Sequence, residues 1–216
     1  MPSCSAYLQA HHLMMPILLL DLDNTLLEYN LDAFVREYLK ALGEHIKQAP
    51  TAKVIQQVLS ATQQMISKQT PDQTLEQCFD QFFYPGIGVD KEALTDRVEL
   101  FYREVYPALR GNTTPRPAAK QIVEYGFEQG MPVVVATNPL FPRTATLQRL
   151  EWADLPATRY PFKLISTYES FHYAKPQTAY YAEILAQLGW LSQPAVMVGN
   201  SLEDDILPAS RLGLPV

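Results

Sequence analysis

The sequence has little of what marks a secreted, membrane-embedded or nucleic-acid-binding chain. It contains two cysteines, Cys4 and Cys78, too few for a disulfide framework and in keeping with a reducing compartment. No run approaches the roughly 18 apolar residues that a transmembrane helix requires. The net charge is −6, and no basic run is available to contact nucleic-acid or lipid phosphates. We therefore expect a cytoplasmic protein with no nucleic-acid or membrane partner.

Internal repeats and low-complexity segments are also absent. Residues 1–14 match no expected element, and we expect them to form a disordered tail. The tail has no basic region of the kind that opens a signal peptide, and Met14 and Met15 offer alternative starts just before the first strand. His11 and His12 lie in this tail, and we expect them to be inert rather than metal-binding.

The most informative segment is an aliphatic run, Ile17–Leu20, that leads into Asp21 and Asp23. Such a run is typical of a strand buried on both faces of a parallel sheet, and ligands bind at the carboxyl ends of such strands. One carboxylate can attack a substrate while the other transfers a proton. A polar turn after a strand would give the same pattern, so this segment alone decides nothing.

A second apolar run, Val133–Val135, is followed by Thr137 and Asn138. Pro139 favours an extended conformation for Asn138, so no helix is expected to start there. The sequence therefore predicts that a hydroxyl and an amide lie at the end of another strand.

A third segment, Lys175-Pro176, precedes apolar residues at helical spacing that end at Gly189. Because proline fits the first turn of a helix, this order predicts that Lys175 is held at a helix entry. A fourth segment is again a buried type of strand, Ala195–Val198, and it leads to Asn200 and an acidic cluster. Adjacent acids repel unless they are solvated at a helix start or bound to a cation.

Taken in this order, the four segments resemble the signature motifs of the haloacid dehalogenase-like (HAD) hydrolase superfamily, in particular its cap-bearing phosphatases. The resemblance extends from Pro16 to the C-terminus, although the stretch between the first two motifs matches nothing specific. It implies an α/β fold with a doubly wound, mostly parallel sheet, the Rossmann-like core of this superfamily, and an inserted helical-bundle cap.

The resemblance also implies a role for each motif residue. Asp21 would be the nucleophile that accepts a phosphoryl group, and Asp23 would protonate the leaving oxygen and later deprotonate water. Thr137, Asn138 and Lys175 would hold the phosphoryl oxygens. Mg²⁺ would be the cofactor.

Four residues are expected to hold Mg²⁺: Asp21, Asp23 through its backbone carbonyl, Asn200 and Asp205. The family commonly has an aspartate where this sequence has Asn200, and an amide removes one negative charge from the site. Asp204 or Asp205 could compensate, and we prefer Asp205. The departure puts the affinity for the metal in doubt more than the reaction class.

The residues between the first two motifs read as helices with apolar stripes, which predicts a helical cap over residues 30–109 and a core over 15–29 and 110–216. The first cap helix is expected to start at Asn30 as N-cap and to end at Gly43. Residues 84–88 are a candidate cap loop or an ordinary turn between helices. Residues 107–117 are rich in Pro, Gly and Thr, as in a hinge.

The remaining core alternates helices and strands: a helix over 118–129, a helix over 143–152 and a strand over 162–166. The family would begin another strand near residues 212–216, so either that strand is very short or the sequence is truncated.

These observations predict a Mg²⁺-dependent phosphohydrolase, monomeric or homodimeric, that acts on a small phosphorylated metabolite. Asp23 favours phosphate esters over carbon–halogen bonds, since only an oxygen leaving group needs the second acid. A phosphomutase would use the same core residues. A catalytically weak phosphate-binding or protein-interaction module is the alternative from another class, because Asn200 could mark the decay of a metal site.

Overall fold

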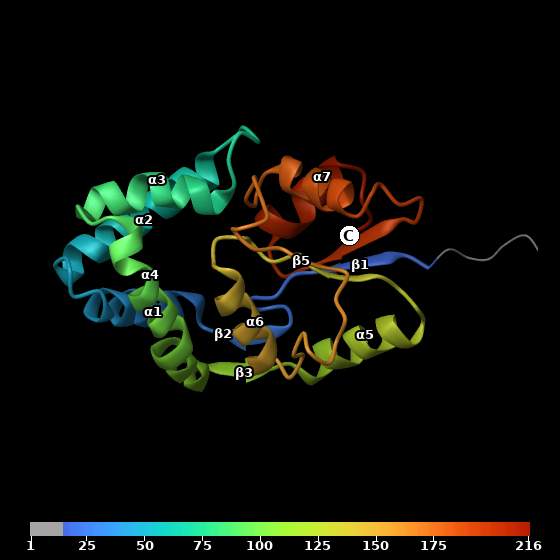
Figure 1. Cartoon of the computed structure of the whole chain (residues 1–216). Coiled ribbons are helices and arrows are strands. Elements are labelled where there is room, and N and C mark those ends of the chain that lie inside the picture. Colours follow the sequence, from blue (N-terminus) through green and yellow to red (C-terminus); the bar gives the residue numbers. More distant parts are fainter. Residues whose placement is uncertain (1–14) are drawn as a thin grey trace, which may run out of the picture.

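The computed structural model describes residues 15–216, so the expectations for Cys4, His11 and His12 lie outside the described residues. Its centre is a parallel sheet of four strands in the order β5-β4-β1-β6 (Figure 1). The strands are β1 (Ile17–Leu20), β4 (Val133–Val135), β5 (Leu164–Ile165) and β6 (Ala195–Val198). The predicted strands are confirmed, although β5 is shorter than expected. β1 lies between β4 and β6, so its end faces the ends of two other motif-bearing strands.

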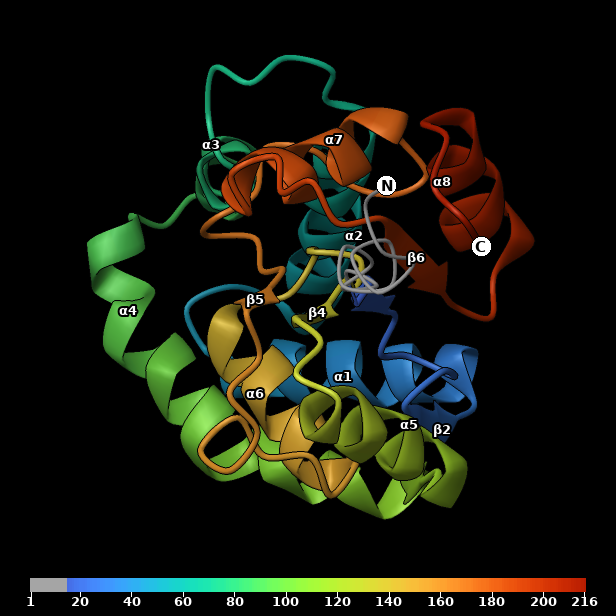
Figure 2. The same cartoon turned by 90° about the vertical axis from the view of Figure 1, so that its right-hand side faces the viewer.

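Helices cover both faces of the sheet. Figures 1 and 2 show α5 (Pro117–Glu128) and α6 (Arg143–Trp152) on one side, and α7 (Thr178–Gln187) and α8 (Leu207–Arg211) on the other. Alternate residues of each strand pack on opposite sides of the sheet, because successive side chains of a strand point to opposite faces. Leu20, Val133 and Val135 belong to the hydrophobic cluster that contains α5 and α6 residues, and Leu19, Val134 and Met197 belong to the one that contains α7 and α8 residues. The predicted α/β fold is confirmed.

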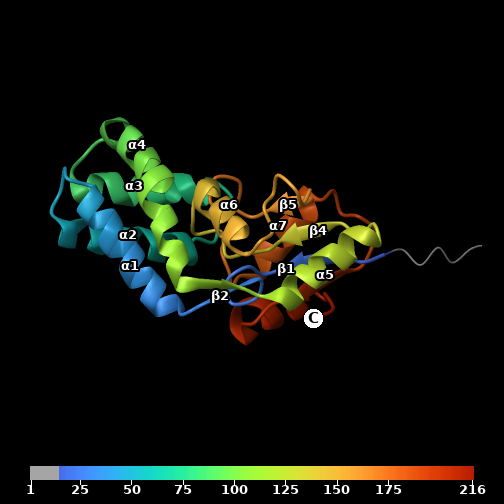
Figure 3. The same ribbon diagram turned by 90° about the horizontal axis from the view of Figure 1, so that it is seen from below.

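Four helices follow β1 and β2 and pack against one another beside the sheet, as Figure 3 shows; we call them the helical insertion. They are α1 (Leu31–His45), α2 (Thr51–Ser67), α3 (Leu75–Ile87) and α4 (Lys91–Leu100). α4 continues as a π-helix over Phe101–Val105 and a 3₁₀ helix over Tyr106–Asn112. Most residues of the apolar stripes lie on the buried faces of these helices, and Asn30 caps α1 by accepting a hydrogen bond from the Ala33 amide.

One expectation for the helical insertion is wrong, and the structure resolves one alternative that the sequence left open. Gly43 does not end α1, because it permits the close approach of α2: a Cβ at this position would lie 2.8 Å from the Thr51 methyl carbon. The candidate loop over residues 84–88 is the last turn of α3, which contains Pro85. The helix ends at Gly88, whose φ of +78° is the left-handed conformation that favours glycine.

The two chain segments that join the helical insertion to the sheet pair with each other. β2 (Leu27–Tyr29) and β3 (Thr113–Pro115) form an antiparallel ribbon in which Leu27 is opposite Pro115. Residues 107–117, which the sequence predicts as a hinge, are therefore the end of a 3₁₀ helix, a strand and the start of α5. The ribbon fixes where the helical insertion leaves and re-enters the core.

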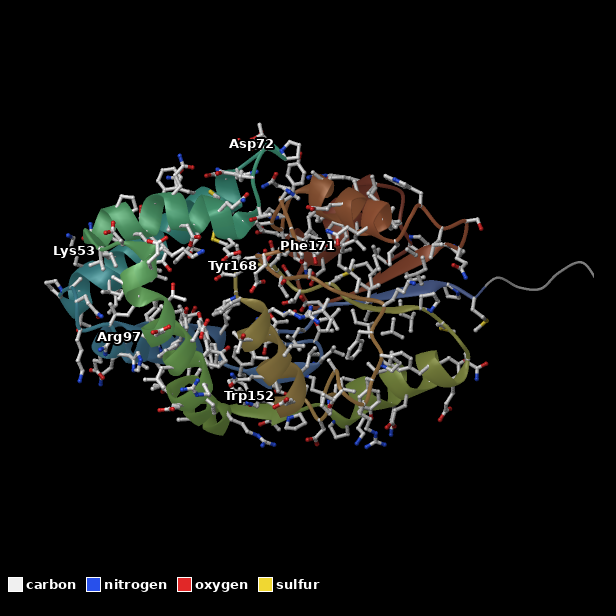
Figure 4. The ribbon with its side chains drawn as sticks, viewed as in Figure 1. Lys53, Asp72, Arg97, Trp152, Tyr168 and Phe171 are labelled. Carbon is white, nitrogen blue, oxygen red and sulfur yellow. The ribbon has the colours of Figure 1, made fainter. Side chains whose placement is uncertain are left out.

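The helical insertion also contacts the core where α2 ends and α3 begins. The amide of Leu75 donates to the carbonyl of Phe171 (2.8 Å), and that of Glu76 donates to the carbonyl of Tyr168 (2.9 Å), where Figure 4 marks the two aromatic residues. The Gln177 side chain donates to two carbonyls at the end of α2. The insertion is thus held against the core at both ends.

Within residues 15–216, no helix is long and apolar enough to cross a membrane.

Candidate active site

The carboxyl ends of β1, β4 and β6 bring the predicted site residues together. Asp21 follows β1 directly, and its amide donates to the carbonyl of Val198 at the end of β6 (3.0 Å). Thr137 follows β4, and its carbonyl accepts hydrogen bonds from Ser166 (2.7 Å) and Tyr180 (2.8 Å). Parallel strands thus place residues from three distant parts of the sequence at one edge of the sheet.

Lys175 lies at the centre of this group and is almost fully buried. Its Nζ donates to Asp21 Oδ1 (2.8 Å) and to Asp205 Oδ1 (2.5 Å). Burial alone would lower the pKa of Lys175, but the charges of Asp21 and Asp205 hold it above its ordinary value. The side chain therefore stays an ammonium group, as a phosphate ligand must.

Asp21 is buried beside other carboxylates. Burial raises the pKa of its carboxyl to about 6, with Lys175 opposing the shift and Asp205 and Asp23 adding to it. A nucleophile must be ionised, and a bound cation would favour the ionised form. The buried setting therefore favours a cation beside the second oxygen of Asp21.

The second oxygen of Asp21, Oδ2, lies near the side-chain oxygens of Thr25 and Asn200. Asp21 Oδ2 and Asn200 Oδ1 both lie at hydrogen-bond distance from the Thr25 hydroxyl, at 3.0 Å and 3.2 Å. Thr25 lies four residues after Asp21, and no role for it could be predicted from the sequence. Carboxylate and amide oxygens suit Mg²⁺, which needs few protein ligands because it keeps several waters and binds substrate phosphate.

Asp205, the preferred substitute metal ligand, already has partners on both oxygens. Oδ1 accepts from Lys175, and Oδ2 accepts from the Ser201 amide (3.0 Å). Gly199 makes room for it, since a Cβ there would lie 2.2 Å from Asp205 Oδ2. Asp204 is half-buried at the wall of the same cavity, and burial raises the pKa of its carboxyl. Within residues 15–216, no group of three or more His, Cys, Asp or Glu side chains is placed to hold a metal.

Two of the predicted phosphate ligands are held with donors available. The Thr137 hydroxyl is buried and has no hydrogen-bond partner within the part of the chain that the structure describes. Asn138 Oδ1 accepts from the Lys175 amide (3.2 Å), which fixes the orientation of its side chain.

The expected helix entry at Lys175 is wrong in detail, because α7 begins at Thr178 and Pro176 precedes it. Lys175 is placed by Asn138 and by its two carboxylates instead.

Asp23 has a partner that the sequence analysis missed. Arg149 of α6 is fully buried, and its guanidinium donates to Asp23 Oδ2 (2.5 Å) while lying over the Phe141 ring, 4.6 Å from its centre. One signal was available. Arg149 lies on the face of α6 that also carries Ala145 and Trp152, and a cation in an otherwise buried face needs a buried acid.

The surroundings of this ion pair contain several polar atoms without partners. Within residues 15–216, Asp23 Oδ1, Arg149 Nε and the hydroxyls of Tyr29 and Tyr106 are buried and make no hydrogen bond. Arg149 thus fixes the orientation of the Asp23 carboxyl group, which lines the cavity. This is the geometry that a group transferring a proton needs.

These groups lie at one end of a cavity of about 480 Å³. Asp21, Asp23, Asn138 and Lys175 line the core end together with other core residues such as Phe141 and Tyr168, and residues of the helical insertion line most of the other end. A cavity of this size suits a small molecule. The arrangement can hold an anion beside a carboxylate nucleophile and a second, oriented carboxyl group.

Comparison with known proteins agrees with this geometry. Residues 15–213 match the family model for haloacid dehalogenase-like hydrolases. A ribulose-1,5-bisphosphate 5-phosphatase from Halopiger xanaduensis is 36% identical over 98 residues, which are 45% of this chain and 39% of that relative. The match thus spans well under half of the curated relative.

Two solved structures share the fold. A HAD phosphatase from Thermococcus onnurineus has a TM-score of 0.55 at 20% identity, covering 93% of this chain and 84% of that one. A HAD hydrolase from Bacillus subtilis, described as bound to magnesium, has a TM-score of 0.53 at 17% identity, covering 92% and 86%.

Proposed function

This chain belongs to the haloacid dehalogenase-like hydrolases, and we propose that it is a Mg²⁺-dependent phosphatase acting on a small phosphate monoester. The observation that carries the proposal is the arrangement around Asp21. A buried carboxylate contacts a buried ammonium group, and a second carboxyl group, Asp23, is held by Arg149 at the wall of the same cavity. An unpartnered hydroxyl, that of Thr137, follows the neighbouring strand.

The reaction has two steps. An oxygen of Asp21 bonds to phosphorus, the bond from phosphorus to the leaving oxygen breaks, and Asp23 gives that oxygen a proton. Asp23 then takes a proton from a water molecule whose oxygen bonds to phosphorus, and the bond from phosphorus to Asp21 breaks. Phosphate leaves, and both carboxyl groups return to their first state.

Lys175, Asn138 and Thr137 hold the phosphoryl oxygens during both steps. The Lys175 ammonium supplies charge, and the Asn138 amide supplies a donor whose position is fixed before substrate binds. The unpartnered Thr137 hydroxyl supplies a second donor. Donors fixed in advance stabilise the developing charge without reorganisation.

Mg²⁺ fits the donors present, with Asp21 Oδ2, Asn200 Oδ1 and the backbone carbonyl of Asp23 as its protein ligands. When bound, it would neutralise negative charge on the phosphoryl group and on Asp21. Asp205 contacts Lys175 and the Ser201 amide, so its contribution to metal affinity would act chiefly through charge.

The helical insertion acts as a cap, with residues 30–109 as the cap and residues 15–29 and 110–216 as the core domain. It is joined to the core by the β2–β3 ribbon and contacts it again through α3. Separation at the α3 contact would admit substrate, and closure would exclude bulk water from the phosphorylated enzyme.

A titration of phosphate release against Mg²⁺ tests the proposal. We expect no release in chelator, and we expect Asn200→Asp to lower the half-saturating Mg²⁺ concentration by about tenfold, since it adds a carboxylate to a hard-cation site. Asp205→Asn should raise that concentration. Release of phosphate at an unchanged rate in chelator would contradict the metal requirement, and identical half-saturation in all three proteins would contradict the ligand assignment.

A further inference from the structure

We propose, on the basis of the proposed function, that the substrate carries a single phosphate on an uncharged, largely apolar leaving group. The inference rests on the part of the cavity beyond the phosphate ligands, where the rest of the substrate must lie. Two features of its wall point to this chemistry: its aliphatic lining and its shortage of cations.

The wall that the helical insertion provides is mainly aliphatic and aromatic. α1 contributes Val35, Leu39 and Leu42, α2 contributes Val58 and Leu59, and α3 contributes Phe83. This lining is continuous with Asp21, Asn138 and Lys175 in one cavity, so a phosphate at the core end directs its leaving group toward these side chains. Burying methylene groups there is favourable, because apolar surface leaves water.

The cavity has very little positive charge to offer a second anion. Among the described residues, Lys175 is the one basic side chain in its wall, and it already contacts two carboxylates. The acidic side chains of the wall are Asp21, Asp23, Asp80, Asp204 and Asp205. Bound Mg²⁺ would offset part of this charge at the core end only. A second phosphate at the insertion end would lie among apolar groups with no cation to pair it, which is costly.

Some of the polar groups in the wall already have partners. The hydroxyls of Tyr38 and Tyr102 are hydrogen-bonded to each other (2.9 Å), and Asp80 is paired with Lys91 (2.5 Å). Buried sugar hydroxyls without partners would cost free energy. The paired groups are not available to a leaving group, whereas the hydroxyls of Thr62, Tyr84 and Tyr168 also line the cavity and could bind a few of its polar atoms.

Apolar side chains also remain in water at the edge of the cavity. Leu31 and Leu59 line the cavity and are nevertheless 47% and 52% exposed. A ligand that extends toward them would cover this surface. The occupant that fits is the hydrocarbon portion of the same molecule whose phosphate is held at Asp21.

The curated relative acts on ribulose-1,5-bisphosphate by its name, so a bisphosphate is the direct competitor of this inference. Binding of three phosphonates to the whole chain in Mg²⁺, measured by calorimetry, separates the two without requiring turnover. The probes are methylphosphonate, hexylphosphonate and hexane-1,6-bisphosphonate. We expect affinity to rise by about threefold per added methylene, and the bisphosphonate to bind at least about tenfold more weakly than hexylphosphonate.

A matched pair of variants locates the apolar contact. Leu59→Asn should lower the ratio of hexylphosphonate to methylphosphonate affinity, whereas Ile122→Asn should leave it unchanged. Ile122 of α5 is exposed to a similar degree, 45%, but does not line the cavity. Both positions are on the surface, so both variants should fold. Equal ratios in the two variants would overturn the placement of the leaving group.

Phosphate release from methyl phosphate, hexyl phosphate and ribulose-1,5-bisphosphate completes the test. If phosphonate affinity rises with chain length but no ester releases phosphate, the proposed function is refuted and the inference about the apolar leaving group stands. Release with no preference for the hexyl chain, or with preference for the bisphosphate, would overturn the inference and leave the phosphatase standing. The absence of binding by all three phosphonates would also overturn it.

Discussion

Asp21→Asn is expected to abolish phosphate release, with a loss of at least about 10⁴-fold in kcat, since removal of a covalent nucleophile removes the whole reaction path. A neutral amide cannot attack phosphorus, yet its shape is almost that of the carboxylate. Phosphate release at saturating substrate and Mg²⁺ measures the effect. Activity within about tenfold of wild type would remove Asp21 from the role of nucleophile.

The same variant should keep its fold, and its stability should report the burial of Asp21. The raised pKa, about 6 in the folded state against an ordinary 3.8, means that Asp21 favours folding below about pH 4 and that this contribution is lost as the pH rises through 6. The variant lacks this loss, and Lys175 keeps Asp205 as a partner. In chelator, the Tm of Asp21→Asn relative to wild type should therefore increase from about pH 4 to about pH 7. A constant difference would contradict the effect of burial.

Asp23→Asn is expected to slow turnover in a manner that depends on the leaving group. Loss of the proton donor should cost about 10²–10⁴-fold with an alkyl phosphate, whose leaving alkoxide needs the proton. The cost should be much smaller with 4-nitrophenyl phosphate, because a nitrophenolate leaves without protonation. The ratio of kcat/KM for the two esters, compared between variant and wild type, is the measurement. An unchanged ratio would show that Asp23 does not protonate the leaving oxygen.

Arg149 provides the control for this variant. Asp23→Asn leaves a fully buried guanidinium without its carboxylate, and breaking such a pair costs about 3–5 kcal/mol. A chain of this size should lose about 2–4 °C in Tm per kcal/mol. The double variant Asp23→Asn/Arg149→Met removes both partners and should recover most of that stability without recovering activity. If stability and activity returned together, the loss in the single variant would be one of folding.

The core strands and their motifs could be predicted from local patterns. Four short segments define the ends of the strands, and the carboxyl ends of adjacent parallel strands meet at one edge whatever lies between them. The apolar stripes of the helical insertion were equally readable, because a helix that buries one face repeats its apolar residues at helical spacing. These features need only information close in sequence.

Contacts between distant segments could not be predicted in the same way. The pair of Asp23 and Arg149 joins residues 126 positions apart, and the β2–β3 ribbon joins the two ends of the helical insertion. The same holds for Asp205, whose contact with Lys175 depends on where α7 begins relative to β6. Gly43 is a further example: glycine favours a helix end by local preference, but this one lies inside α1, where its missing Cβ leaves room for Thr51 of α2.

The central claim is that Asp21 accepts a phosphoryl group between Lys175 and a bound Mg²⁺. Beryllofluoride on a carboxylate resembles an aspartyl phosphate, so it should bind wild type only when Mg²⁺ is present. The decisive measurement is the Tm with and without beryllofluoride, in Mg²⁺ and in chelator, for wild type and Asp21→Asn. We expect a rise of about 5–10 °C for wild type in Mg²⁺ at about 100-fold excess over Kd, and no rise in the other three conditions. No rise for wild type in Mg²⁺, or an equal rise in Asp21→Asn, would contradict the claim and favour a phosphate-binding module.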